Sequence, residues 1–214
     1  MAKGSRVGWF VGGVFALIGI PFALIGWTDA NAAAEIEQLP LLTATTLEAT
    51  SPDTKAVLEG RISETNQFPF RAFAAYVSEV YGGQDCDDDG SCEAIWIEQE
   101  KVLPRLWLDL PDGRTRLANT DYRVEHFSVT WQSSEEFVEG QTLQYRGFEV
   151  GDAVFAVGHP TRNDDQTTFA AEFVSDGQRD GYVSWKRTGG YIFFGAGIFF
   201  STVGVGLVLR QIFA

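Results

Sequence analysis

Two long apolar segments limit the possible folds of this chain more than any other feature. They are VGWFVGGVFALIGIPFALIGW, residues 7–27, and GGYIFFGAGIFFSTVGVGLVL, residues 189–209. Each has 21 residues and no charged side chain, and a helix that crosses a bilayer needs about 20 apolar residues. Tryptophan or tyrosine stands near the ends of both segments, as at membrane interfaces. The sequence therefore predicts two transmembrane helices, residues 7–27 and 189–213.

Charged residues around the first segment predict its orientation. Lys3 and Arg6 precede it, whereas Asp29 and Glu35 follow it, so the positive-inside rule places the N-terminus in the cytoplasm. Two spans put both ends of the chain on the same side. Residues 1–6 then form a cytoplasmic tail, and the middle of the chain lies outside the cytoplasm, in the periplasm or the extracellular space. Two basic residues precede the second segment on the side that the rule disfavours: Lys186 and Arg187.

A second interpretation of the first segment is a secretory signal. Ala30-Asn31-Ala32 has the form of a signal peptidase site, which would place cleavage after Ala32. The apolar run is longer than the roughly 7–15 residues of a signal peptide, and this favours an uncleaved anchor. Both interpretations export the middle of the chain.

Small residues recur at four-residue spacing within the apolar segments. The pairs are Gly8 with Gly12, Gly197 with Ser201, and Thr202 with Gly206. Such pairs let helix backbones approach closely, and packing of this kind drives helix association in lipid. We expect these residues to pack helices together, either within one chain or between copies in a homo-oligomer. The alternative is that glycine is simply common in membrane helices.

The middle of the chain predicts one β-rich domain over residues 55–187. A linker over residues 28–54 joins it to the first span, and residues 30–39 of this linker are compatible with an extension of the first helix. Runs of β-branched and aromatic residues separated by turn residues indicate short strands. The predicted strands are 56–64, 71–81, 93–102, 105–110, 122–131, 152–159, 167–175 and 181–186. Asp112-Gly113 predicts a hairpin. The fold class is therefore mainly β, a sandwich or small barrel anchored by two transmembrane helices.

Charge and motifs argue against several function classes. The chain has 29 acidic and 16 basic residues, and all of the acidic ones lie between Asp29 and Asp180. Such a surface repels phosphates, so nucleic acid is not an expected partner. The chain contains none of the common hydrolase, zinc-protease, Walker A or Rossmann motifs, and His126 and His159 are 33 residues apart. We therefore expect neither enzymatic activity nor a cofactor.

The segment GGQDCDDDGSCE, residues 82–93, has the strongest local pattern. Asp85, Asp87 and Asp89 match the first ligands of an EF-hand-like calcium loop, and Glu93 stands at the ninth position. The twelfth position is Trp96, where such a loop needs a bidentate glutamate. A calcium site at these four acidic residues is therefore one interpretation, and a solvated turn is another.

The two cysteines of the same segment predict a third arrangement. Cys86 and Cys92 are the only cysteines of the chain, so their pairing is unambiguous if they pair at all. The segment lies in the exported part, and disulfides persist outside the cytoplasm. We expect a disulfide that holds a hairpin tip closed.

Three stretches of the middle domain resemble a known family. They are AVLEGRISETNQFPFRAFAAYVSEVYGG, PRLWLDLPDGRTRLANTDYRVE and GFEVGDAVFAVGHPTRNDDQTTFAAEFVSDGQRDGYVSW. Together with the two spans they resemble the GIDE-type (MULAN-like) domain of membrane-anchored E3 ubiquitin ligases. In that family a first span, a β-rich domain beside the membrane and a second span precede a cytosolic RING finger. The resemblance implies a two-span anchor with an external domain that senses or binds partners.

The ligase activity of that family is not expected here. A RING finger needs eight zinc ligands, whereas this chain has two cysteines and ends at Ala214 after the second span. The leading hypothesis is therefore a non-catalytic, membrane-anchored interaction module that lacks the RING. The alternatives are a calcium-responsive external domain and a scaffold for a membrane ligase-like complex. A protein partner that carries basic residues would suit the acidic surface, and the candidate contacts are aromatic: Phe68, Phe70, Tyr76 and Trp107.

Overall fold

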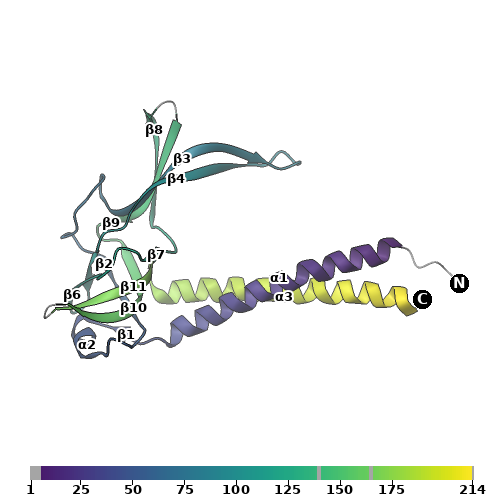
Figure 1. Ribbon diagram of the computed structural model, residues 1–214, viewed down its shortest axis with the longest axis horizontal. Coiled ribbons are helices and arrows are strands. Elements are labelled where there is room, and N and C mark those ends of the chain that lie inside the picture. Colours follow the sequence, from purple (N-terminus) through teal and green to yellow (C-terminus); the bar gives the residue numbers. More distant parts are fainter. Residues whose placement is uncertain (1–5, 139–140, 164–165, 214) are drawn as a thin grey trace. The chain divides into compact units, whose positions relative to one another are not determined.

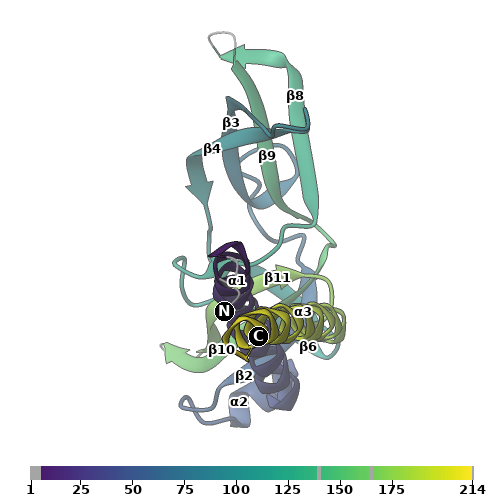
Figure 2. The same cartoon turned by 90° about the vertical axis from the view of Figure 1, so that its right-hand side faces the viewer.

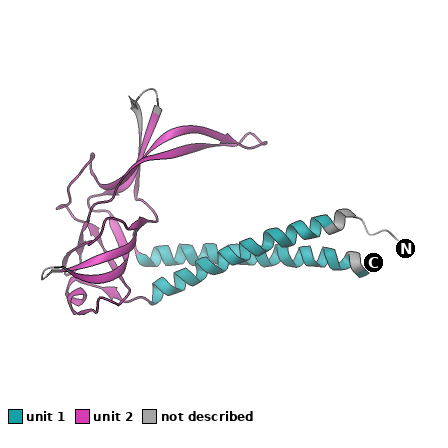
Figure 3. Cartoon of the chain, viewed as in Figure 1, with its two compact units in different colours: residues 1–38, 179–214 teal, residues 39–178 magenta. Residues whose placement is uncertain are grey.

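The computed structural model describes residues 6–138, 141–163 and 166–213 and divides the chain into two compact units (Figures 1 and 3). The first unit contains the two ends of the chain, residues 1–38 and 179–214, and the second contains residues 39–178. Residues 1–5 of the predicted cytoplasmic tail lie outside the described part. The layout of two terminal helices around a β-rich body agrees with the predicted one.

The first unit is an antiparallel pair of long helices, which lie side by side in Figures 1 and 2. Helix α1 spans Arg6–Gln38 and helix α3 spans Arg179–Phe213. Both are long and apolar enough to cross a membrane. Each continues past its apolar segment at the same end of the pair, through residues 28–38 and 179–188. These extensions would add roughly 15 Å of polar helix at 1.5 Å per residue.

A seven-residue repeat of small residues joins the two helices. Gly12, Gly19 and Gly26 of α1 are buried, as are their partners on α3: Gly204, Gly197 and Gly190. A Cβ atom at Gly12 would lie 2.8 Å from the carbonyl oxygen of Gly204, and one at Gly19 would lie 2.6 Å from that of Gly197. The helix backbones are therefore in direct contact, which only glycine permits at these positions.

The β body contains two open sheets. The first runs in the order β6-β5-β2-β10-β11-β7, with β1 paired to β2. Its strands are β1 Leu41–Leu42, β2 Ala56–Ile62, β5 Trp107–Leu110, β6 Gly113–Arg116, β7 Arg123–Val124, β10 Ala153–Asn163 and β11 Gln166–Asp176. Short helix α2, Ala44–Ala49, precedes β2. The apolar core lies against this sheet and includes Leu58, Leu108, Tyr122, Phe148 and Phe169, all fully buried.

The second sheet is antiparallel throughout and runs in the order β4-β3-β9-β8. Its strands are β3 Phe73–Cys86, β4 Cys92–Val102, β8 Val129–Val138 and β9 Gln141–Glu149. Figures 1 and 2 show it projecting from the seven-stranded sheet of the same unit. Neither sheet closes on itself through its described strands, so the body is not the small barrel that was one of the two predicted forms. Closure fails because β4 and β8, like β6 and β7, end their sheets without pairing to each other.

One predicted strand is wrong, and another is divided. Residues 181–186 form the first turns of α3 and not a strand. Val183 is buried seven residues before Gly190, so this segment continues the packed face of the helix. Residues 122–131 form β7 and the start of β8, with a break between them.

Candidate interaction site on the four-stranded sheet

The distal half of the β3–β4 hairpin is the candidate site, and we call residues 81–102 the arm. The two strands pair from Tyr76 with Val102 to Cys86 with Cys92. At the tip, the backbone N–H of Asp87 donates to the carbonyl of Ser91 (2.8 Å), and that of Gly90 donates to the carbonyl of Asp87 (2.9 Å). Gly90 has φ +85°, a conformation that favours glycine. These bonds close the turn.

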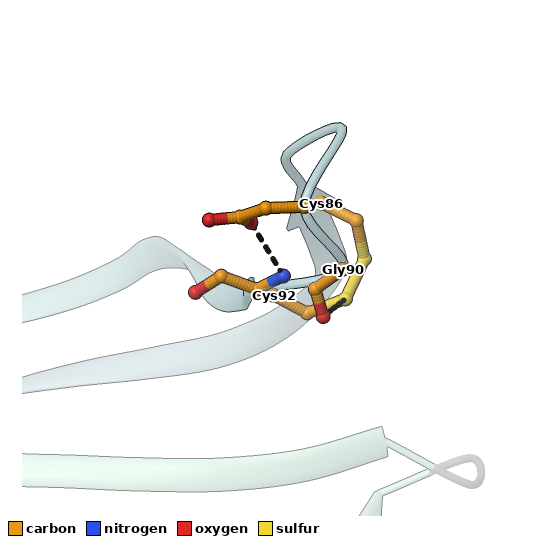
Figure 4. Close-up of a disulfide and its surroundings, with 5 residues drawn as sticks. Cys86, Gly90 and Cys92 are labelled. Atoms are coloured by element: carbon orange, nitrogen blue, oxygen red, sulfur yellow. Dashed lines mark hydrogen bonds between the residues drawn. A yellow bond between two sulfur atoms is a disulfide. The ribbon is translucent and has the colours of Figure 1, made fainter.

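A disulfide joins Cys86 to Cys92 across the last strand pair of the arm, as the sequence predicts (Figure 4). The two residues are six positions apart. The crosslink fixes the tip although four aspartates surround it, because it removes the open conformations that charge repulsion would favour.

The acidic residues of the predicted calcium loop lie on the outside of this tip. Asp85 stands opposite Glu93 in the strand pairing. Asp89 accepts a hydrogen bond from the backbone N–H of Ser91 (2.9 Å), and the side chain of Asp87 is exposed. In the part of the chain that the structure describes, no group of three or more histidine, cysteine, aspartate or glutamate residues could hold a metal ion. The calcium site stays a prediction.

Strand β4 is the exposed edge of the sheet. Among the strands that the structure describes it pairs with β3 only, and all of its side chains are exposed except those of Trp96 and Val102, which are half-buried. Trp96 packs edge-on against Tyr81 on one face, with ring centroids 5.8 Å apart. On the other face Ile95 and Ile97 are 44% and 49% exposed.

Beside the arm, an aromatic cluster covers one region of the sheet. Phe70 stacks on Tyr145 with ring centroids 4.3 Å apart, and Tyr76 and Trp131 contact the same pair. The guanidinium of Arg71 lies 3.7 Å from the centre of the Trp131 ring. Arg71 has φ +50°, which is uncommon for a residue other than glycine.

The predicted aromatic contact residues have different environments in this structure. Phe68 is 45% exposed, whereas Phe70 belongs to the aromatic cluster and Tyr76 is buried within it. Trp107 lies on the other sheet, half-buried, with the Arg116 guanidinium 5.6 Å from its ring. Phe68 is therefore the only one of the four that is exposed. Burial, and a hydrogen bond to Glu100 (3.1 Å), raise the pKa of Tyr76 above its ordinary value.

A polar network stiffens the same sheet. Arg146 of β9 forms a bidentate pair with Glu79 of β3, and its Nε lies 3.0 Å from Oε2. Gln144 donates to the same carboxylate (3.0 Å) and accepts from Gln132 of β8 (2.7 Å). Glu79 is only 7% exposed, so its pairing satisfies a charge that would be costly to bury alone. Three strands of the sheet are thus connected through side chains.

His159 and the arginines beside one surface cavity of the body are engaged by neighbouring groups. His159 Nε2 lies 3.1 Å from Glu172, which also pairs with Lys55 (3.0 Å) at the surface. Burial raises the pKa of Glu172, but Lys55 and His159 outweigh it and lower that pKa overall. A cavity of 240 Å³ is lined by Arg114 and Arg116 among others. Both are engaged elsewhere, Arg114 with Asp109 (2.6 Å) and Arg116 with a backbone carbonyl.

The predicted helix-packing residues divide into two groups. Gly12, Gly197 and Ser201 lie at the α1–α3 contact. Thr202 is exposed and donates to the carbonyl of Phe199 (2.9 Å), and a Cβ at Gly206 would meet no atom within 4 Å. Gly8 belongs to α1. Four-residue spacing missed most of the contact, whereas the seven-residue repeat in the sequence would have identified it: Gly12, Gly19 and Gly26 with Gly190, Gly197 and Gly204.

Comparison with known protein families, curated proteins and solved structures finds no match for this chain.

Proposed function

We propose that the protein is a non-catalytic, membrane-anchored interaction module whose β body binds another membrane or exported protein. The observation that supports this best is the helix pair. Two helices of bilayer-spanning length pack backbone to backbone through three glycine pairs. Such packing suits lipid, where van der Waals contact and not the hydrophobic effect drives helix association. The exposed aromatic residues near the ends of the apolar segments suit the membrane interface: Trp27, Trp185 and Tyr191.

The sidedness of the proposal has two supports. A disulfide at the tip of the arm is typical of an exported domain. The basic residues that the positive-inside rule disfavours beside the second span have acidic partners on α1. Lys186 Nζ lies 3.1 Å from Asp29, and Arg187 pairs with Glu37. We therefore propose cytoplasmic termini and an exported body.

The relation to the GIDE-type domain is part of the same proposal. Its support is the order of elements: a long apolar helix, a β body and a second long apolar helix. Because the proposal concerns binding, it assigns the body no catalytic residue.

Affinity purification tests this function. The full chain carries a C-terminal tag and is purified from native membranes in mild detergent, with an unrelated tagged two-span protein as control. We expect a partner protein in stoichiometric amount that is absent from the control. A chain that emerges from membranes alone, at full yield and correctly folded, would contradict the interaction-module function.

A further inference from the structure

We propose that β4 is a docking edge for an extended, basic segment of a partner protein, which adds to the four-stranded sheet as a fifth strand. The inference rests on the interaction function proposed above and names its surface and the chemistry of its partner. An edge strand presents unpaired backbone N–H and C=O groups along its length. Strand β4 is Cys92–Val102, 11 residues long, and has a described partner only in β3.

The edge lacks most of the features that keep natural edge strands from pairing. Natural edges are protected by shortness, proline, bulges, charged side chains or covering. Strand β4 is long, exposed and free of proline, although it carries charges and its pairing with β3 has two register shifts. Ile95 and Ile97 add a β-branched apolar surface on one face. Ile95 is paired to Gly83 of β3, which offers it no side chain directly opposite, whereas Ile97 is paired to Val80 and lies beside Gly82. The surface is therefore open to a side chain from a partner strand.

The charge of the arm decides which partner fits. Its 22 residues include seven acidic side chains and one basic one, Lys101. The acidic residues are Asp85, Asp87, Asp88, Asp89, Glu93, Glu98 and Glu100. A second copy of β4 would bring three more glutamates against the first three, and like charges that face each other are destabilising. A strand that alternates basic with β-branched residues would place its apolar side chains against Ile95 and Ile97 on one face and its charges against Glu98 on the other, beside a strongly acidic arm.

Contacts within the chain hold the arm at both of its ends. The disulfide closes its tip, and the network of Glu79 with Arg146 and Gln144 holds its base to the next strand. A preformed edge loses little conformational entropy on binding. This geometry matches recognition by strand addition, in which main-chain bonds supply affinity and side chains supply specificity.

A synthetic peptide tests the docking edge directly. The probe is a fluorescent nine-residue peptide that alternates lysine with valine, and its control replaces each valine with proline. The two have the same charge, but the proline peptide cannot form a sheet ladder. The full chain is held in nanodiscs of zwitterionic lipid, empty nanodiscs are the blank, and anisotropy gives Kd. We expect the valine peptide to bind at least about tenfold more tightly, and more weakly as salt rises.

Variants of the chain locate the binding site. The double variants Ile95→Ser/Ile97→Ser and Glu93→Gln/Glu98→Gln should each weaken binding about tenfold. Leu41→Ser, which changes a residue of similar exposure (46%) on the other sheet, should leave Kd unchanged. Equal binding of both peptides, no measurable binding, or unchanged binding by the isoleucine variant would overturn the docking edge.

The double variant Ile95→Ser/Ile97→Ser also separates this inference from the proposed function. If a partner purified with the wild-type chain is lost with Ile95→Ser/Ile97→Ser but kept with Leu41→Ser, both proposals gain support. If the isoleucine variant keeps the partner, the docking edge is wrong and the interaction function stands. If the wild-type chain emerges alone, the proposed function fails, and the partner inference fails with it.

Discussion

The carboxylate of Asp112 connects two segments that lie 68 residues apart in the sequence. From the turn between β5 and β6 it accepts the backbone N–H of Ala44 at Oδ1 (2.8 Å) and that of Thr45 at Oδ2 (3.1 Å). These are N–H groups of the first turn of α2, which have no partner inside the helix. The Thr43 hydroxyl and the two backbone N–H groups hold the pKa of Asp112 well below its usual range. The body is thus stabilised by the ionised form of this side chain.

We expect Asp112→Asn to lower the melting temperature of the full chain in detergent at pH 7. Because the folded pKa is depressed, the stabilisation is present above the unfolded pKa of about 3.9. It is lost as the pH falls from there towards the folded pKa. The difference between variant and wild type should therefore shrink below about pH 4, as tryptophan fluorescence during heating would show. Asp53→Asn, another exposed carboxylate of the body, is the control. A pH-independent difference would contradict this account.

Tyr122 supplies a second prediction from a single side chain. It is 1% exposed, its hydroxyl donates to the carbonyl of Pro104 (2.9 Å), and burial raises its pKa above the ordinary value. Tyr122→Phe should lower the free energy of unfolding by about 1 kcal/mol. Because the folded pKa is raised, wild-type stability should fall as the pH rises above about 10, where the unfolded side chain ionises. Denaturant titrations of both chains measure this. The control is Tyr191→Phe, at a residue that is 62% exposed. It should change neither the free energy of unfolding nor the dependence of that free energy on pH.

At the scale of elements, the contact between α1 and α3 depends on the absence of side chains. A Cβ atom at Gly197 would lie 2.6 Å from the carbonyl oxygen of Gly19 and 2.7 Å from the Cα of Ala23. Both are backbone atoms, so the helices would have to separate. Gly195, on the same helix, would meet no atom within 4 Å.

This contrast predicts opposite signs for two similar substitutions. Gly197→Ala should destabilise the helix pair by about 1–3 kcal/mol through overpacking. Gly195→Ala should stabilise the helix by up to about 1 kcal/mol, because alanine has the higher helix propensity. Thermal unfolding of the full chain in detergent, followed by far-UV circular dichroism, compares the two. Shifts of the same sign and size would show that the glycine contacts between α1 and α3 do not hold the helix pair together.

The elements that the sequence predicts well are those with a strong local pattern. The stretch Ala56–Ile62 combines β-branched and apolar residues and forms β2, and residues 152–159 likewise lie largely within β10. Strand β9, Gln141–Glu149, was missed because polar residues and Gly147 interrupt its pattern. Residues 181–186 were assigned the wrong type, since Tyr182, Val183 and Trp185 have high strand propensity but their segment continues a packed helix. Propensity is overridden by tertiary context in such cases.

The candidate site was only partly predictable for the same reason. Cysteine count and export predict the disulfide of Cys86 with Cys92, which needs no knowledge of the fold. The edge position of β4 depends on strand order, which is set by pairings such as Val77 with Arg146, 69 residues apart in sequence. Nothing local in residues 92–102 specifies which of their sides stays unpaired. Strand order therefore had to come from the structure.

At the scale of the whole molecule, the basic residues beside each span bear on orientation. Lys3 and Arg6 precede the first span, and the next basic residue after that span is Lys55. The first span usually determines orientation, which favours cytoplasmic termini. The pairs of Lys186 with Asp29 and of Arg187 with Glu37 then lie on the exported side. Each pair neutralises a cation beside the second span.

This orientation predicts the labelling of the cysteines, which occur only at positions 86 and 92. In intact cells, an impermeant maleimide-polyethylene glycol should add nothing without reductant. After reduction by an impermeant phosphine, the reagent should add two polyethylene glycol groups to each chain. An exported disulfide must be reduced before its cysteines can react. In the opposite orientation, the reducing cytoplasm would leave free thiols that react only after lysis and without reductant. A chain with Cys86→Ser, Cys92→Ser and Ala214→Cys controls for permeability and should be labelled only after lysis. Labelling of the wild-type chain only after lysis, without reductant, would contradict the proposed orientation. It would also contradict the proposal that the body binds an exported partner.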